Sequence, residues 1–479
     1  MIMLAGCVGT PSVSGVAGTA PAPNHPWTPP STRGRAAPAR TDTAAALPPD
    51  LAARVSQLTL ADIVDLALRN NPATRISWEN ARAAAAAYGS QLGAYYPTID
   101  GQVGATRIKT LSTQGRSAVE QTTYGPSLSI SWLLLDFGGR SGAIEGARQA
   151  LVAADFTHNA TLQQVVLQVE SAYFDYMASK ALVAAQRQTV EEARANLAAA
   201  QERRRVGVAT VADELQARTA LSQAQLALET TEGTLLTTRG ALAVSVGLPA
   251  NVPYDVQPPD TTLPVSGVAD SVDVLIARAV ESRPDLAAAV ADSAQAHARI
   301  GEIRAERLPS LSLDGTGGRT FGGPLPKTGG NSYTLTLGLR IPLFAGFSRA
   351  YNQMAAEAQA RAAAARLDAT RQQVIFQVFS SYYALQTATR RVRTADDLLA
   401  SAQQSYDVAL GRYKAGVGTV LDLLAAQSAL ADARAQQVQA RWVWRTALSQ
   451  LAHDAGVLDV HGGSPIRLAP DTTGQQPPR

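Results

Sequence analysis

One long stretch of the chain, which begins at Gly139, has a stripe of mostly apolar residues at alternating steps of three and four. It runs to Arg205 without a proline, turns, and returns to Gly247. The outgoing arm places on one face Val166, Val169, Tyr173, Tyr176, Lys180, Val183, Arg187, Val190, Arg194 and Leu197. The return arm repeats leucine every seven residues, at Leu221, Leu228, Leu235 and Leu242. This spacing predicts a helical hairpin over 139–247, whose outgoing helix is on the order of 100 Å long.

The hydrophobic period changes to two after Pro97. From Thr98 onward, apolar or small residues alternate with polar ones, as in Ile99, Gly101, Val103 and Ala105. After a polar loop, Leu128, Ile130 and Trp132 alternate with Ser127, Ser129 and Ser131. This pattern predicts a β-hairpin over 98–136, made of strands of about ten residues with one apolar and one polar face.

The second half of the chain repeats the first. Asn71-Pro72 recurs as Arg283-Pro284, 212 residues later, and beyond the strands the offset becomes 209, so that Arg140 corresponds to Arg349. An offset held over so many positions indicates an internal duplication. The second copy is expected to hold a β-hairpin over 310–345 and a long helical hairpin over 348–456. The predicted organisation is an N-terminal Pro/Ala-rich segment, 1–57; repeat 1, 58–248; a Pro-rich linker, 249–270; repeat 2, 271–461; and a disordered tail, 462–479.

The predicted fold class is therefore mainly α, with two tandem repeats that each add one β-hairpin, and four strands in total. An open sheet edge in lipid leaves unpaired amides, while in water the apolar face would have no cover. Closed membrane barrels begin at about eight strands. The chain must therefore combine its strands with those of its own copies: two chains give a barrel filled by side chains, and three give twelve strands around a lumen.

Composition excludes several other classes of function. The net charge of +3 comes without a polybasic run, so no nucleic-acid partner is expected. The apolar runs are too short for a spanning helix, so a membrane would be crossed by strands. The histidines show no metal-ligand spacing, and they are His25, His158, His297, His453 and His461. We expect neither an enzyme nor a metal site.

The only cysteine, Cys7, follows Leu4-Ala5-Gly6. Leu-Ala-Gly-Cys resembles a bacterial lipobox, in which the cysteine becomes the acylated first residue. An ordinary cysteine is the alternative, and the six preceding residues are too few for a signal peptide, which suggests a truncated or misassigned start. By the same resemblance, Val8 after the cysteine indicates sorting to the outer membrane. A covalent lipid on Cys7 is the only non-protein group expected.

The ordered duplication and the sequence at the second helical turn resemble TolC/OprM-type outer-membrane efflux proteins. That sequence is Arg412-Tyr413-Lys414-Ala415-Gly416, followed by Thr419-Val420-Leu421-Asp422-Leu423-Leu424. The resemblance implies a homotrimer in outer-membrane lipid, with a twelve-stranded β-barrel and a twelve-helix periplasmic barrel. It also implies conduction of drugs, toxic compounds or metals, energised by an inner-membrane transporter through a periplasmic adaptor protein. The alternatives are a type I secretion duct and, in a different class, a periplasmic coiled-coil scaffold without a pore.

The resemblance also suggests a gate at the helix turns. Asp422 matches an aspartate that forms a carboxylate ring in the closed entrance, and Tyr413 and Asp213 match a hydrogen bond that ties the two hairpins together. The chain departs from that pattern at Gly418, where the family has an arginine, and at Ala425, where it has a second aspartate. The competing interpretation is that both aspartates only stabilise the N-terminal ends of their helices, where the helix dipole favours a negative charge.

The two turns also carry the candidate adaptor-docking tips, Gly207-Val208 and Gly416-Val417. Glycine permits a tight turn and the close approach of a partner's backbone. A plain interhelical turn is equally compatible with these residues.

Overall fold

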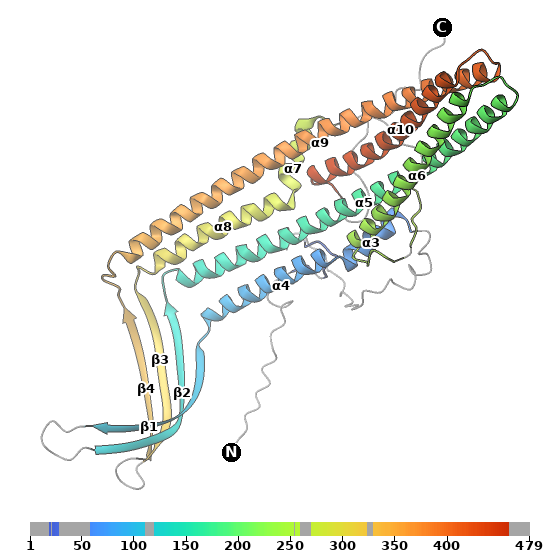
Figure 1. Ribbon diagram of the computed structural model, residues 1–479. Helices are drawn as coiled ribbons and strands as arrows, with labels where there is room; N and C mark the ends of the chain where they lie inside the picture. The colour runs from blue at the N-terminus through green and yellow to red at the C-terminus, as the bar shows by residue number, and fades with distance from the viewer. Residues whose placement is uncertain are drawn as a thin grey trace. The chain divides into compact units, whose positions relative to one another are not determined.

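The computed structural model describes residues 19–20, 22–27, 58–110, 119–252, 254–258, 270–322 and 329–458 (Figure 1). Two helices, two strands and a long helical hairpin follow one another twice, which agrees with the duplication. The elements are α3 (Leu60–Asn70), α4 (Pro72–Leu92), η1 (Gly93–Tyr95), β1 (Thr98–Thr110), β2 (Val119–Leu135), α5 (Gly139–Arg205), α6 (Val211–Ser245), α7 (Val272–Ser282), α8 (Pro284–Ala305), β3 (Ser310–Phe321), β4 (Gly329–Arg340), α9 (Ser348–Lys414) and α10 (Val420–Asp454).

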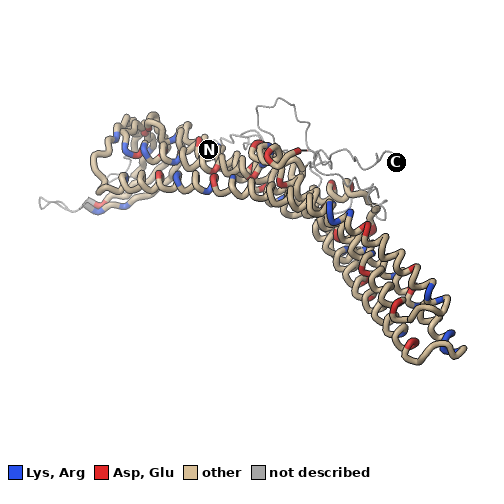
Figure 2. Tube along the Cα trace, turned by 90° about the horizontal axis from the view of Figure 1, so that it is seen from above, with Lys and Arg blue, Asp and Glu red and all other residues tan. Residues whose placement is uncertain are grey.

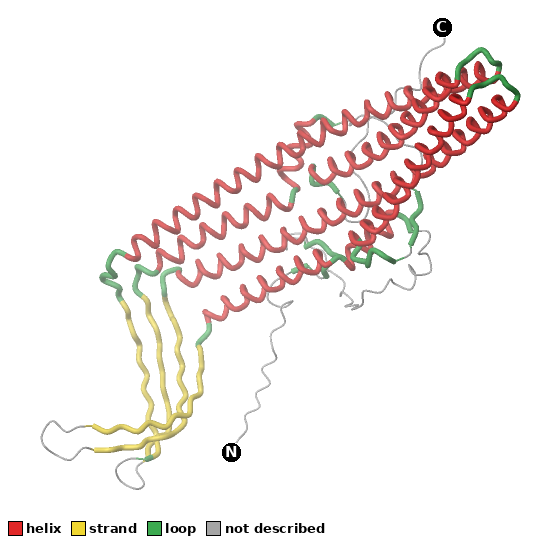
Figure 3. The backbone as a smooth tube through the Cα atoms, viewed as in Figure 1, coloured by secondary structure: helices red, strands yellow, loops and turns green. Residues whose placement is uncertain are grey.

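The long helices begin and end where the sequence predicts. Helices α5 and α9 each have 67 residues, which corresponds to a contour length of about 100 Å. Figure 3 shows how strands occupy one short stretch of each repeat while helices make up most of the rest. Figure 2 shows Lys and Arg distributed among Asp and Glu along the helices, as the absence of a polybasic run implies.

The chain divides into two compact units. The first comprises Met1–Thr19, Asn80–Asp155 and Ala288–Asp368, and it contains the sheet. The strand order is β1-β2-β3-β4, with every neighbouring pair antiparallel. Both predicted hairpins are confirmed, with strands of 12 to 17 residues, longer than expected. The pairing of β2 with β3 joins the two repeats into one sheet.

The second unit comprises Ala20–Glu79, Phe156–Ala287 and Ala369–Arg479. Its core runs along the predicted helical stripe, where Val169 and Tyr173 are fully buried. The stripe is not buried along its whole length, because Arg187 is exposed, and further on Arg194 is exposed while Ala193 beside it is buried. Small side chains let neighbouring helices approach closely, while Arg194 reaches solvent and pairs with Glu191 at 2.6 Å.

The linker between the repeats lies along α5. The Tyr173 hydroxyl donates to the Gln257 carbonyl at 2.6 Å, and Lys180 Nζ contacts both carboxylate oxygens of Asp255 at 2.8 and 2.9 Å. Val256 forms a parallel bridge with Leu58, at the start of repeat 1. These contacts fix the described part of the linker to the helical core.

Part of the N-terminal segment is a strap on α4 and α5. The Trp27 backbone N–H donates to the Asn159 side chain at 2.7 Å, and the Asn159 amide donates to the Trp27 carbonyl at 2.8 Å. The Trp78 indole donates to the Ala20 carbonyl at 2.9 Å. These contacts hold the described residues 20 and 22–27 against the two helices.

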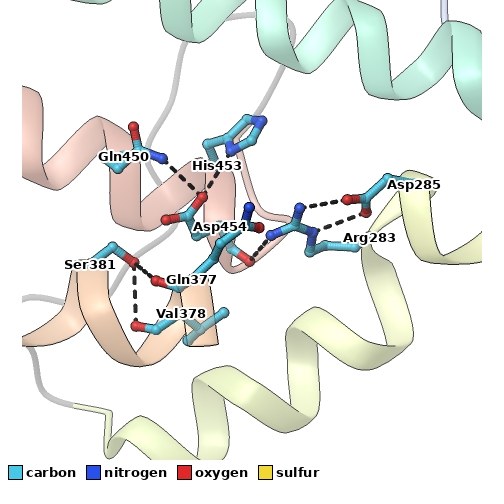
Figure 4. Close-up of polar contacts among 8 residues, drawn as sticks. All are labelled: Arg283, Asp285, Gln377, Val378, Ser381, Gln450, His453 and Asp454. Carbon is cyan, nitrogen blue, oxygen red and sulfur yellow. Dashed lines mark hydrogen bonds and ion pairs between the residues drawn. The ribbon is translucent and has the colours of Figure 1, made fainter. Parts of the chain in front are cut away.

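The junction of α7, α8 and α10 is a dense polar network (Figure 4). Arg283, 6% exposed, binds both oxygens of Asp285 at 2.6 and 3.0 Å and donates to the Asp454 carbonyl at 3.3 Å. At the corresponding junction of repeat 1, Asn71 donates to the Ser245 carbonyl at 2.9 Å. Different side chains thus hold the end of each return helix in the same way.

Candidate functional site

Both helical hairpins turn through the same backbone motif. In the first turn, the N–H of Val208 donates to the Arg203 carbonyl at 2.9 Å, and Gly207 has φ +80°. In the second, the N–H of Val417 donates to the Arg412 carbonyl at 3.0 Å, and Gly416 has φ +78°. This is a Schellman ending, in which a left-handed residue closes the helix. Glycine is required there because a side chain with a Cβ atom rarely adopts this conformation.

The aspartates at the turns belong to the caps of the return helices. Thr210 begins α6 and Thr419 begins α10, and each exchanges hydrogen bonds with the aspartate three residues on, Asp213 or Asp422. The Thr419 hydrogen bonds lower the pKa of Asp422, which is solvent-exposed and therefore ionised at neutral pH. Both aspartates therefore lie in helix caps, and Asp422 leaves a negative charge at the second turn.

Tyr413 is held by an arginine from the other hairpin. The Arg203 guanidinium lies 4.8 Å from the centroid of the Tyr413 ring and donates to the Tyr413 carbonyl at 2.9 Å. The Tyr413 hydroxyl is buried and has no hydrogen-bond partner among the described residues. Burial raises the pKa of Tyr413, and the negative charge of Asp213 adds to this against the opposing effect of Arg203.

The expected hydrogen bond between Tyr413 and Asp213 is therefore not formed in this structure. Asp213 Oδ2 instead accepts from the Thr210 N–H at 2.8 Å and from its hydroxyl at 2.9 Å. Sequence reasoning missed Arg203, which no spacing rule connects to a residue 210 positions away. The two hairpins do meet at Tyr413, but through a cation–π contact.

A second connection between the hairpins lies further along the helices. Arg434 on α10 donates to both carboxylate oxygens of Glu192 on α5, each at 2.9 Å. Next to them, the Asn196 amide donates to the Gln427 side chain at 2.8 Å, and both of these residues are 5% exposed. Such bidentate and buried contacts fix the register of two helices.

The two tips differ in their interiors. Glu214, 7% exposed, pairs with Arg204 and with Arg218, the latter at 2.9 Å. The hydrogen bond from Arg204 is the main reason that the pKa of Glu214 is lowered. The equivalent residue in repeat 2 is Leu423, which is fully buried in an apolar cluster with Tyr413. The sequence analysis did not single out Glu214, although the i, i+4 spacing to Arg218 is a recognisable signal.

Both tips carry exposed apolar side chains. Val208 and Val417 are 62% and 70% exposed, and Leu421 is 60% exposed. With the glycines beside them, they form the surface on which we expected a partner.

The sheet has one polar and one apolar face along its whole width. On the polar face, Gln102 of β1 pairs with Ser127 of β2. In the neighbouring row, Ser129 of β2 pairs with Thr316 of β3, which pairs with Thr334 of β4. The alternate positions are apolar and uncovered in the single chain, including Ile99, Val103, Leu128, Tyr333, Leu335, Leu337 and Leu339, which are between 57% and 90% exposed. A fold that exposes so much apolar surface requires lipid or another chain on that face.

Comparison with known proteins identifies the family. The profile described as "Outer membrane efflux protein" matches residues 63–248 and 275–457. The chain belongs to this family. It is non-enzymatic, and it is an outer-membrane channel of an efflux system that extends into the periplasm. None of the helices in the described ranges is both long and apolar enough to cross a bilayer.

Relatives match nearly the whole of this efflux protein. It is 30% identical to Protein CyaE of Bordetella pertussis over 433 residues, which cover 90% of each chain. It is 25% identical to the probable efflux pump outer membrane protein TtgC of Pseudomonas putida over 410 residues, covering 84% of this chain and 83% of the relative.

Solved structures agree with this assignment. A membrane protein from Pseudomonas aeruginosa superposes with a TM-score of 0.76 at 26% identity, covering 83% of this chain and 93% of that one. The CmeC outer membrane channel of Campylobacter jejuni superposes with a TM-score of 0.74 at 20% identity, covering 83% and 86% of the two chains, and it supports the fold alone.

The one buried histidine among the described residues of the efflux protein has a structural role. His158 is fully buried between the Ser77 hydroxyl, at 2.8 Å, and the His25 carbonyl, at 3.1 Å, and burial lowers its pKa. Within the described residues, no three His, Cys, Asp or Glu side chains gather as potential metal ligands. Cys7 lies outside the described residues.

Proposed function

We propose that three copies of this chain form one export channel, with the β1 and β4 edges of neighbouring copies paired. The observation that carries the proposal is the uncovered apolar face of a four-stranded sheet with two open edges. Because the strands alternate in direction and are even in number, β4 of one copy can continue the antiparallel sheet with β1 of the next. Three copies supply twelve strands, and the polar face then surrounds water.

The channel conducts small molecules that an inner-membrane transporter delivers through a periplasmic adaptor protein. Several relatives carry names that refer to antibiotic, toluene or solvent efflux pumps, which supports small, partly apolar cargo such as drugs or toxic compounds. Metals stay in the proposed range of cargo, as the family resemblance implies. Nothing in the tunnel wall has to recognise cargo if the transporter selects it.

The helix turns are the periplasmic gate. Three copies of Asp422, each ionised, would make a ring of negative charge that attracts cations. Tyr413 and Asp213 contribute to closure: the tyrosine ring holds Arg203 of the other hairpin, and Asp213 fixes the start of α6. The exposed tips at Gly207-Val208 and Gly416-Val417 offer an apolar surface for the hairpin of the adaptor.

A lipid on Cys7 anchors the N-terminus to the outer membrane. The lipobox-like sequence supports this, as does the strap, which holds residues 20 and 22–27 on the helices. Mass spectrometry of the N-terminal peptide from membranes, compared with a Cys7→Ala variant, tests the acylation.

The channel proposal is tested by purification from outer membranes followed by bilayer recording. We expect extraction only with detergent, a cross-linked trimer, and single-channel conductance. A water-soluble monomer without conductance would refute the trimeric pore. Cells lacking the gene should become sensitive to apolar toxic compounds, whereas loss of a secreted polypeptide with unchanged sensitivity would support the type I secretion alternative.

A further inference from the structure

A cavity of about 510 Å³ lies where the strands meet the helices, within the first unit. Figure 1 shows this region, where β3 and β4 run up to α8 and α9. The charged residues of its wall are Arg140, Arg340, Arg349, Asp136, Glu302 and Glu306. Nothing in the proposed conduction pathway accounts for so many charges at one place.

In repeat 1 the arginine of this wall has a carboxylate partner and two backbone acceptors. Arg140 donates to the Leu133 carbonyl at 2.6 Å and to the Leu134 carbonyl at 3.0 Å, and its Nε lies 3.5 Å from the Asp136 carboxylate. The same carboxylate accepts from the Arg140 backbone N–H at 2.5 Å. Asp136 thus neutralises the arginine and caps the start of α5.

Repeat 2 keeps the arginine and lacks the carboxylate. Arg349 corresponds to Arg140, but the residue that corresponds to Asp136 is Ala345. Both loops follow a left-handed path, since Phe137 has φ +52° and its counterpart Gly346 has φ +60°. The Cβ of Ala345 therefore stands where the Asp136 carboxylate is attached in repeat 1.

The missing carboxylate leaves positive charge without a partner in the cavity. Among the described residues, neither the Arg349 nor the Arg340 side chain has a hydrogen-bond or ion-pair partner. Of the acidic wall residues, Asp136 is committed to Arg140, and Glu302 is committed to Arg299 at 2.6 Å. Two arginines then face one uncommitted carboxylate, Glu306, and the balance of free charge is positive.

We propose that this cavity binds a small oxyanion, with Arg340 and Arg349 as its ligands and with the anion in the place that Asp136 fills in repeat 1. Guanidinium groups match the geometry of phosphate and carboxylate oxygens, and two of them can hold one such group. The ligand class is therefore a phosphate- or carboxylate-bearing molecule. Arg340 shares the polar face of β4 with Thr334 and Thr336, which favours a water-soluble ligand over a lipid headgroup.

The test is isothermal titration of the purified full-length protein with inorganic pyrophosphate, at constant ionic strength against chloride. Arg340→Gln and Arg349→Gln should each weaken binding roughly tenfold, as expected for the loss of one charge-assisted contact. Ala345→Asp should abolish binding while the protein stays folded, because it supplies the carboxylate internally. Arg107→Gln, which alters an arginine paired with Glu120 near the β1–β2 loop, is the matched control and should bind as the wild type does.

Native mass spectrometry after extraction distinguishes the source of the anion. Retention of an anionic phospholipid that depends on Arg349 would assign the same site to a lipid headgroup. Absence of both pyrophosphate binding and lipid retention, or equal binding by Ala345→Asp, would overturn the proposal. The titration does not require conductance, so a protein that binds pyrophosphate but forms no pore would refute the channel and leave the site standing.

Discussion

The guanidinium of Arg203 lies over the ring of Tyr413, 4.8 Å from its centroid, and joins the first helical hairpin to the second. The contact uses the ring and the backbone carbonyl of the tyrosine, while its hydroxyl has no partner among the described residues. A link of this kind has consequences that differ from those of a tyrosine–aspartate hydrogen bond.

Tyr413→Phe should therefore leave the closed channel unchanged, because phenylalanine retains the ring that Arg203 contacts. Arg203→Ala should raise the resting single-channel conductance, since it removes both contacts to Tyr413. Bilayer recording of the two variants checks this. If Tyr413→Phe opens the channel and Arg203→Ala does not, the hydroxyl and Asp213 form the latch after all.

Asp422→Asn should reduce cation selectivity and relieve block by divalent cations, because it removes the proposed ring of charge. The Thr419 hydrogen bonds lower the pKa of Asp422 in the single chain, and the like charges of a closed ring would oppose this, so the cation selectivity should fall as the ring is protonated. Reversal potentials measured between pH 3 and pH 7 test both points. Asp432→Asn, an exposed aspartate further along α10, is the control, and an equal effect in both variants would exclude a specific ring.

Breaking the pair of Arg434 and Glu192 on one side should destabilise the protein by about 3 kcal/mol, because a largely buried charge loses its partner. Their side chains are 10% and 20% exposed. Arg434→Met should therefore lower the Tm clearly. Changing both residues, Arg434→Met with Glu192→Leu, should recover most of the loss, and a double variant as unstable as the single one would contradict this account.

Asp155 makes stability depend on pH. It is fully buried, neither carboxylate oxygen has a hydrogen-bond partner, and burial raises its pKa from 3.8 to about 7. The folded-state pKa lies above the unfolded one, so the folded state is penalised increasingly as the pH rises toward 7. The free energy of unfolding of Asp155→Asn, relative to that of the wild type, should therefore be higher at pH 8 than at pH 5. The increase should be roughly 3 kcal/mol at most. Thermal unfolding at both pH values measures it, and an equal difference at the two would refute it.

The two faces of the sheet should respond oppositely to charge. Leu337→Arg places a cation on the apolar face, at a cost of about 2–4 kcal/mol if that face meets lipid. Thr336→Arg places the same cation on the polar face and should be tolerated. The measurement is the amount of heat-resistant oligomer that each of the two variants forms in outer membranes. Equal amounts for Leu337→Arg and Thr336→Arg would argue against a membrane barrel.

The sequence by itself determined the order of elements, the helical hairpins, the strands with two faces, and the glycine turns. These features follow from the periodicity of apolar residues and from backbone preferences, both of which act over a few residues. The internal duplication presents each of these signals twice. The candidate aspartates were located by resemblance to the family, and the structure adds that each belongs to a capping box begun by Thr210 or Thr419.

Only the tertiary structure decided which side chains meet across the hairpins. Arg203 with Tyr413 and Arg434 with Glu192 each join residues more than 200 positions apart, and no local pattern encodes such a pair. The same holds for β2 beside β3, which merges the two repeats into one sheet. Which positions of the α5 stripe are buried was likewise not encoded locally: Arg187 and Arg194 are exposed, because burial depends on how closely a neighbouring helix approaches, and that distance is set by packing.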